Sequence, residues 1–132
     1  TMKQYNVYTA TITTELVKLG YGIIETGSNS NGTRVKFSNG FTIAQVVQNT
    51  SITISNQYGS THVYYVNVTL NLPKTFTDVT GASYGKSQYS TGASWGYVMD
   101  YTTSTVTFRV LDALARSSSQ TTYFMATVYG YS

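Results

Sequence analysis

Six side chains in the sequence could carry acid or base chemistry, and they are five carboxylates and one histidine. These residues are Glu15, Glu25, Asp78, Asp100, Asp112 and His62. Glycoside hydrolysis needs two carboxylates that face one bond at roughly 5–9.5 Å, and Asp78 with Asp100 is the pair to test for it. Aspartates in turn-rich segments more commonly cap turns or face solvent. The sequence therefore favours a protein that is not an enzyme.

The histidine does not change that interpretation. His62 could belong to a Ser-His-Asp triad, but the sequence contains no Gly-x-Ser-x-Gly nucleophile elbow. Three copies of His62 on a threefold axis could form an imidazole metal site, but a strand-end histidine in solvent is the preferred interpretation. Cysteine is absent, which excludes disulfides and thiolate ligands. We expect no metal and no cofactor.

The sequence favours ligand binding over catalysis, because residues 80–103 combine aromatic rings with four glycines and a carboxylate. An aromatic ring offers a flat apolar face to a sugar, and a phenol or indole group can bond its hydroxyls. Loops set on a rigid sheet commonly hold binding residues. The competing interpretation is that these rings pack in a core or a subunit interface. The predicted ligand-binding residues are Tyr84, Tyr89, Trp95, Tyr97, Asp100 and Tyr101.

Composition restricts the class of protein. At 132 residues the chain is one domain, and only 10% of it is charged while 14% is aromatic, a balance typical of β structure. The net charge of +3 comes from scattered Lys and Arg without a patch, so no nucleic-acid partner is expected. No apolar run approaches 18 residues, so no membrane insertion is expected.

The most informative element is a hairpin centred on Asn39-Gly40. Asn-Gly is the preferred pair for a two-residue type I′ turn, which needs positive φ at both positions. That turn sets Lys36 opposite Ile43 and places Val35 and Phe37 on the face of Ala44 and Val46, opposite to that of Phe41 and Ile43. Both faces are then apolar, so one should meet another layer or another subunit.

Alternation elsewhere predicts about eight short strands and therefore an all-β fold, an antiparallel β-sandwich or a barrel-like head. Residues 13–19 are expected to form a short helix capped by Gly20, and 26–32 a polar loop. Pro73 should end the best amphipathic strand. The predicted strands are Tyr5–Ile12, Tyr21–Glu25, Ser51–Ser55, His62–Leu72, Thr75–Val79, Ser94–Asp100, Ser104–Leu111 and Thr121–Tyr131, in addition to the two of the hairpin.

Three segments carry a family resemblance. Residues 25–43 (ETGSNSNGTRVKFSNGFTI) resemble the Gly-Ser-Asn-x-Asn-Gly-x-x-x-Lys-Phe pattern that opens the C-terminal head of many bacteriophage tail fibres. Residues 65–78 are similar to their middle strand with its Leu-Pro-x-x-Phe turn, and 124–132 to their closing strand. The chain departs from the family at Gln45-Val46-Val47, where a pair such as Trp-Gly is common.

The resemblance implies a homotrimeric receptor-binding head at the tail fibre tip of a virion, acting outside the bacterial cell. Its partners are expected to be two further copies of itself, an upstream fibre segment and a host surface polysaccharide. Residues 1–24 would then be a stalk junction and 25–132 the head. The alternatives are a trimerisation and folding cap, recognition of an outer-surface protein, or a polysaccharide depolymerase.

Overall fold

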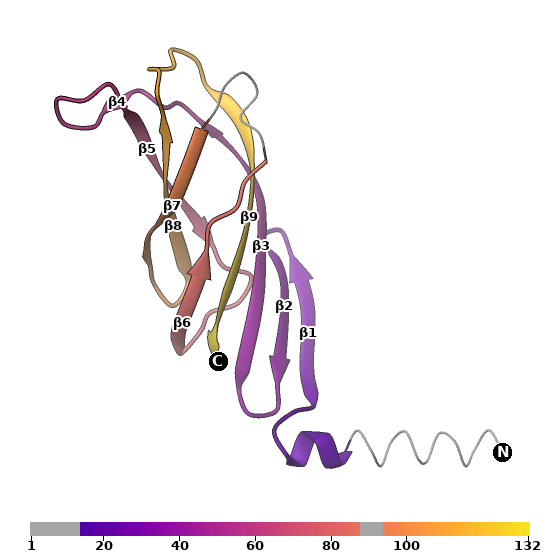
Figure 1. Ribbon diagram of the computed structural model, residues 1–132. Coiled ribbons are helices and arrows are strands. Elements are labelled where there is room, and N and C mark those ends of the chain that lie inside the picture. Colours follow the sequence, from indigo (N-terminus) through magenta and orange to yellow (C-terminus); the bar gives the residue numbers. More distant parts are fainter. Residues whose placement is uncertain (1–13, 88–93) are drawn as a thin grey trace.

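The computed structural model describes residues 14–87 and 94–132, and these form β strands apart from a single helical turn at 14–18. Figure 1 shows the strands running along the length of the molecule, with the helical turn at the lower end of β1. The nine strands of the described residues are β1 (Ile23–Asn29), β2 (Gly32–Phe37), β3 (Phe41–Ile52), β4 (Asn56–Gln57), β5 (Tyr64–Asn71), β6 (Asp78–Ser83), β7 (Ser94–Tyr101), β8 (Thr105–Asp112) and β9 (Gln120–Tyr131). Within the described residues, no helix has the length and apolarity that crossing a membrane requires.

The strands form two separate sheets. One has five strands in the order β1-β2-β3-β9-β6, and the other has four in the order β4-β5-β8-β7. Every pair of neighbouring strands runs antiparallel. The two sheets pack against each other (Figure 1). The all-β antiparallel prediction is confirmed, and of the two predicted forms the two-sheet sandwich is the one observed.

The core lies between the sheets and follows from the alternation of four strands. Inward-facing residues of β3 and β9 meet those of β5 and β8, and Phe108 lies 5.8 Å from Phe124 between ring centroids. Burying one such side chain contributes roughly 1.5–3 kcal/mol. The fully buried apolar residues include Ala44, Val46, Ile54, Leu70, Val106, Phe108, Val110, Phe124 and Val128.

The β2–β3 hairpin differs from the prediction by one residue. Lys36 pairs with Thr42 and Val35 with Ile43, so the loop has three residues and not two. Gly40 has a φ of 90°, while no other residue type in the described chain has positive φ, Asn39 included. Gly40 N donates to Phe37 O at 2.9 Å, and the Asn39 side chain accepts from Phe41 N at 2.9 Å. A three-residue loop with one left-handed residue fits this pattern.

This register reverses the two faces of β2, because one residue of slip moves every side chain to the other side. Val35 and Phe37 project outward with Phe41 and Ile43, and Arg34 and Lys36 project inward. The outer side of the five-stranded sheet consequently carries a partly exposed apolar group, which we call the apolar face. It consists of Val35, Phe37, Phe41, Ile43, Tyr129 and Tyr131.

Phe41 is at the centre of the apolar face. Its ring centroid lies 6.1 Å from that of Phe37, 6.3 Å from that of Tyr129 and 5.9 Å from that of Tyr131. Beside it is an open hollow of about 240 Å³ next to the helical turn. The hollow is lined by Gly20, Tyr21, Phe37, Asn39, Phe41 and Ile43.

The helical turn ends as its sequence predicts. Gly20 adopts a φ of 84°, and Gly20 N donates to Val17 O at 3.1 Å. Tyr21 N donates to Leu16 O at 2.9 Å, so carbonyls left over at the helix end are bonded. The strand predicted at Tyr5–Ile12 lies outside the described residues.

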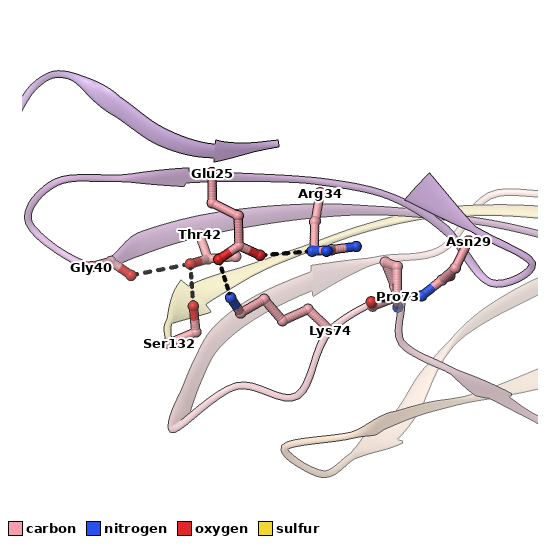
Figure 2. A network of polar contacts seen from close by, with 8 residues as sticks. All are labelled: Glu25, Asn29, Arg34, Gly40, Thr42, Pro73, Lys74 and Ser132. Carbon is pink, nitrogen blue, oxygen red and sulfur yellow. Dashed lines mark hydrogen bonds and ion pairs between the residues drawn. The ribbon is translucent and has the colours of Figure 1, made fainter. Parts of the chain in front are cut away.

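The predicted polar loop at 26–32 is wrong, since β1 continues to Asn29 and only two residues separate it from β2. Polar contacts explain why so polar a segment is held as an edge strand (Figure 2). The Glu25 carboxylate accepts from Arg34 Nε at 2.8 Å and from Lys74 Nζ at 2.7 Å. Asn29 Nδ2 donates to Pro73 O at 2.9 Å. These bonds join β1 to the segment that leaves β5.

The remaining strand predictions agree closely with the structure. The amphipathic segment 62–72 becomes β5 and ends before Pro73, and the last three predicted strands become β7, β8 and β9. Three details differ. Residues 51 and 52 are the end of β3 and not the start of a separate strand, and β4 has no counterpart among the predicted strands. β6 begins at Asp78, three residues later than predicted, and continues to Ser83.

Candidate functional site

Trp95 and Tyr97 lie on the outer side of β7, the edge strand of the four-stranded sheet. Their side chains are 48% and 43% exposed, while Gly96 between them and Val98 after them face inward. Alternate residues of a strand point to the same face and are separated by roughly 7 Å. The structure therefore presents these two predicted residues side by side to solvent.

The strand register shows which residues surround them, because residues opposite each other in neighbouring strands share a face. Trp95 pairs with Leu111, which pairs with Tyr65 on β5. Tyr97 pairs with Arg109, which pairs with Asn67. Together with Tyr58, which follows β4, these residues form what we call the aromatic face: Tyr58, Tyr65, Asn67, Trp95, Tyr97, Arg109 and Leu111.

Arg109 lies in the middle of the aromatic face, with its guanidinium group over the ring of Tyr65. Its guanidinium carbon is 4.4 Å from the ring centroid of Tyr65 and 5.8 Å from that of Tyr58. The two rings meet edge to face with centroids 5.8 Å apart. Arg109 Nε donates to Asn67 Oδ1 at 3.0 Å. Stacking and the hydrogen bond together fix the orientation of the guanidinium group.

Leu111 forms the apolar floor between the rings. It is only 9% exposed although it points away from the sandwich core, and it does not belong to the core cluster. Tyr65 and Trp95 stand on either side of it in the register. A flat, largely apolar strip with polar groups along one side results, and this arrangement suits the face of a sugar ring.

Asp100 also reaches the outer side, as a result of a β-bulge. The register shifts between Val98 and Asp100, which leaves Met99 unpaired and sets Asp100 opposite Thr107. Thr107 in turn bonds Thr69 at 2.9 Å between hydroxyl oxygens. One Asp100 oxygen accepts the Tyr101 backbone N–H at 2.8 Å. Asp100 is therefore one row beyond Tyr97 on the same outer side.

The other three predicted residues do not join this group. Tyr101 pairs with Val106, whose side chain is in the core, so the register sets Tyr101 toward the inner side at the strand end. Tyr84 is half-buried, and its ring meets Phe108 edge to face at 5.0 Å. Burial raises the pKa of the Tyr84 phenol. Tyr89 lies outside the described residues.

Five members of the aromatic face were not among the predicted site residues: Tyr58, Tyr65, Asn67, Arg109 and Leu111. The outward alternation of Tyr65 and Asn67 along the 62–72 strand was the available signal. Arg109 is 42 positions from Asn67, so nothing local in the sequence indicates that they touch.

The candidate acid and base residues are dispersed. Asp78 begins β6 in the five-stranded sheet, whereas Asp100 belongs to the four-stranded sheet. His62 is exposed in the turn before β5. Across residues 14–87 and 94–132, no three His, Cys, Asp or Glu side chains gather closely enough to hold a metal ion.

Fold and site together define an all-β two-sheet sandwich with a solvent-facing aromatic strip on one sheet. Comparison of the chain with protein-family models, curated proteins and solved structures gives no match.

Proposed function

We propose that this chain is the receptor-binding head of a bacteriophage tail fibre and that its aromatic face binds a host surface polysaccharide without cleaving it. The observation that carries the proposal is the exposure of Trp95 and Tyr97 at alternate positions of an edge strand. Tyr65 lies on the same outer side of the sheet, across Leu111 from Trp95. Rings presented this way can stack on successive sugars of a polymer. The resemblance of residues 25–43 and 65–78 to tail fibre heads supplies the biological setting.

Polar groups beside the rings would provide orientation. Asn67 and Arg109 offer donors and an amide, and Asp100 offers a carboxylate one row further along the same outer side. Stacking on rings tolerates many sugars, so hydrogen bonds from such groups would select among them. Because the acid and base residues are dispersed over two sheets, the proposed action is adhesion and not cleavage.

The proposal includes a homotrimer. The apolar face supports it, since Val35, Phe41 and Ile43 are only partly covered within one chain. Exposed contiguous apolar surface commonly marks a protein interface. Individual sugar sites of about millimolar affinity would gain effective concentration when three of them share one tip.

The apolar face also favours a second candidate function. The chain could serve as a trimerisation and folding cap of a fibre, with receptor specificity elsewhere. This candidate needs the apolar face but makes no use of the aromatic face.

One experiment distinguishes the two functions. The purified chain and its Trp95→Ala and Tyr97→Ala variants are tested for retention on a panel of immobilised bacterial surface polysaccharides, with mass in solution measured in parallel. We expect at least about a tenfold loss of affinity, equivalent to roughly 1.4 kcal/mol, with assembly unchanged. Leu114→Ala, which removes a still more exposed apolar group from the loop after β8, is the control and should bind normally.

Two results would count against adhesion. No retention of the unmutated chain on any polysaccharide would leave the cap as the better candidate, provided that the trimer forms. Shortening of a polysaccharide during incubation would show cleavage, and Asp78→Asn and Asp100→Asn would then identify the acid.

A further inference from the structure

We infer that the aromatic face selects an acidic polysaccharide and that Arg109 binds the carboxylate of a sugar acid stacked on the neighbouring rings. The inference rests on the proposed function and adds the chemical class of its ligand. It arises from the state of a single guanidinium group, which is ordered by its surroundings yet left without an acidic partner.

The order of the group comes from two sides. The Tyr65 ring lies 4.4 Å below the guanidinium carbon, and Asn67 accepts the Nε hydrogen at 3.0 Å. Within the described chain, no hydrogen bond or ion pair engages the two terminal amino groups of Arg109. Their hydrogens form the fork that matches both oxygens of a carboxylate.

Three other cations beside the strands are paired with a carboxylate, and Arg109 differs from them. Glu25 forms ion pairs with both Arg34 and Lys74, and Asp112 forms one with Arg116 at 2.8 Å. Arg109 forms none. Asp100, one row away on the adjoining strand, forms no ion pair with it and instead accepts the N–H of Tyr101.

The surroundings fit a sugar acid better than a free anion. Leu111 and the flanking rings of Tyr65 and Trp95 give an apolar strip directly beside Arg109. A uronic acid carries its carboxylate on the sugar ring itself, so one residue can stack on the strip and reach the fork. A neutral sugar would leave the fork to water, and a small anion would leave the rings unused.

The test compares polymers that differ in charge. Binding is measured to polygalacturonate, to the same polymer with every carboxylate methyl-esterified, and to phosphomannan, whose charge is a phosphate, all at one ionic strength. We expect polygalacturonate to bind at least about tenfold more tightly than its methyl ester. Raising the salt concentration should weaken this preference, because the contact is charged and partly exposed.

Three variants locate the effect. Arg109→Gln should abolish the preference for the free acid while the residual binding of the methyl ester persists. Arg109→Lys should restore only part of the preference, because ammonium keeps the charge but lacks the fork. Lys18→Gln removes one positive charge from the helical turn, far from β8 in sequence, and should leave binding unchanged. Melting temperatures confirm that each variant folds.

The outcomes separate this inference from the function on which it rests. Equal binding of acid and ester, both reduced by Trp95→Ala, would overturn the acidic preference and retain polysaccharide binding. Tighter binding of phosphomannan than of polygalacturonate would overturn the carboxylate assignment. Absence of binding to these three polymers and to every polysaccharide of the bacterial panel, or Arg109-dependent binding of a single-stranded oligonucleotide instead, would overturn both proposals.

Discussion

Val35 lies directly opposite Ile43 in the β2–β3 ladder, and both side chains project from the outer side of the five-stranded sheet. Phe37 and Phe41 extend the same surface toward the turn. One chain thus exposes an apolar patch that its own sandwich cannot bury. We expect this patch to be covered by further copies of the chain.

Replacing Ile43 by Asp should dissociate the proposed homotrimer. A carboxylate buried between subunits loses hydration without gaining a partner, whereas in a monomer the same group would reach water at little cost. The expected result is a mass in solution that falls to that of one chain, with the melting of the monomer little changed.

The matched control is Thr69→Asp, which puts the same charge on the outer side of the four-stranded sheet and should leave the mass unaltered. If the unmutated chain itself is a stable monomer in dilute buffer, the trimer is wrong.

The three-residue hairpin loop predicts how substitutions of Gly40 and Asn39 change the free energy of unfolding. Gly40→Ala should lower the free energy of unfolding by roughly 1–2 kcal/mol, the cost of a left-handed non-glycine residue. The added methyl carbon would have no atom nearer than 3.6 Å, so the loss of stability measures backbone strain alone.

Asn39→Gly should also destabilise the hairpin, since it removes the bond to Phe41 N. A two-residue type I′ turn predicts the opposite, because Gly accepts positive φ more readily than Asn. Urea unfolding decides between them, and a gain in stability for Asn39→Gly would contradict the observed register.

Glu25 predicts a specific dependence of stability on pH. Hydrogen bonds first from Arg34 and then from Lys74 lower its pKa from 4.5 to about 2 in the folded chain. A lowered folded-state pKa contributes stability that is complete above pH 4.5 and is lost as the pH falls from about 4.5 to about 2.

The Glu25→Gln variant should therefore have a lower urea midpoint than the unmutated chain at pH 7, and this gap should close near pH 2. Glu15→Gln is the control, because the Glu15–Lys18 pair is largely exposed and contributes little. A gap that is the same at both pH values would mean that Glu25 acts by packing and not by its charge.

Among the predicted ligand-binding residues, Tyr84 is expected to contribute to packing and not to polysaccharide binding. Its hydroxyl oxygen is buried, with no hydrogen-bond partner in the described part of the chain. Tyr84→Phe removes this unsatisfied group and should leave the free energy of unfolding unchanged or raise it by up to about 1 kcal/mol. Tyr84→Ala removes the ring against Phe108 and should cost roughly 3 kcal/mol.

Neither Tyr84→Phe nor, where it remains folded, Tyr84→Ala should weaken polysaccharide binding, because the ring is on the inner side of β7. Calorimetric unfolding and polysaccharide retention provide the two measurements. A loss of binding in the Tyr84→Phe variant, with stability unchanged, would place this phenol at the ligand.

Sequence alone determined the fold class and most strand positions, because these depend on local patterns. Alternation along β5, β8 and β9 marks which residues enter the core, and Pro73 and Gly20 end their elements through their own backbone geometry. The same alternation places Trp95 and Tyr97 on one side of a strand, but only the structure shows that this side faces solvent.

Only the tertiary structure decided the hairpin register, the length of β1 and the composition of the aromatic face. Asn39-Gly40 suits two kinds of loop, and the choice between them depends on what the two faces of β2 meet. Glu25 is held by Lys74, and Arg109 by Asn67, across 49 and 42 positions of sequence. Contacts of that range are set by strand order and sheet packing, which no local pattern encodes.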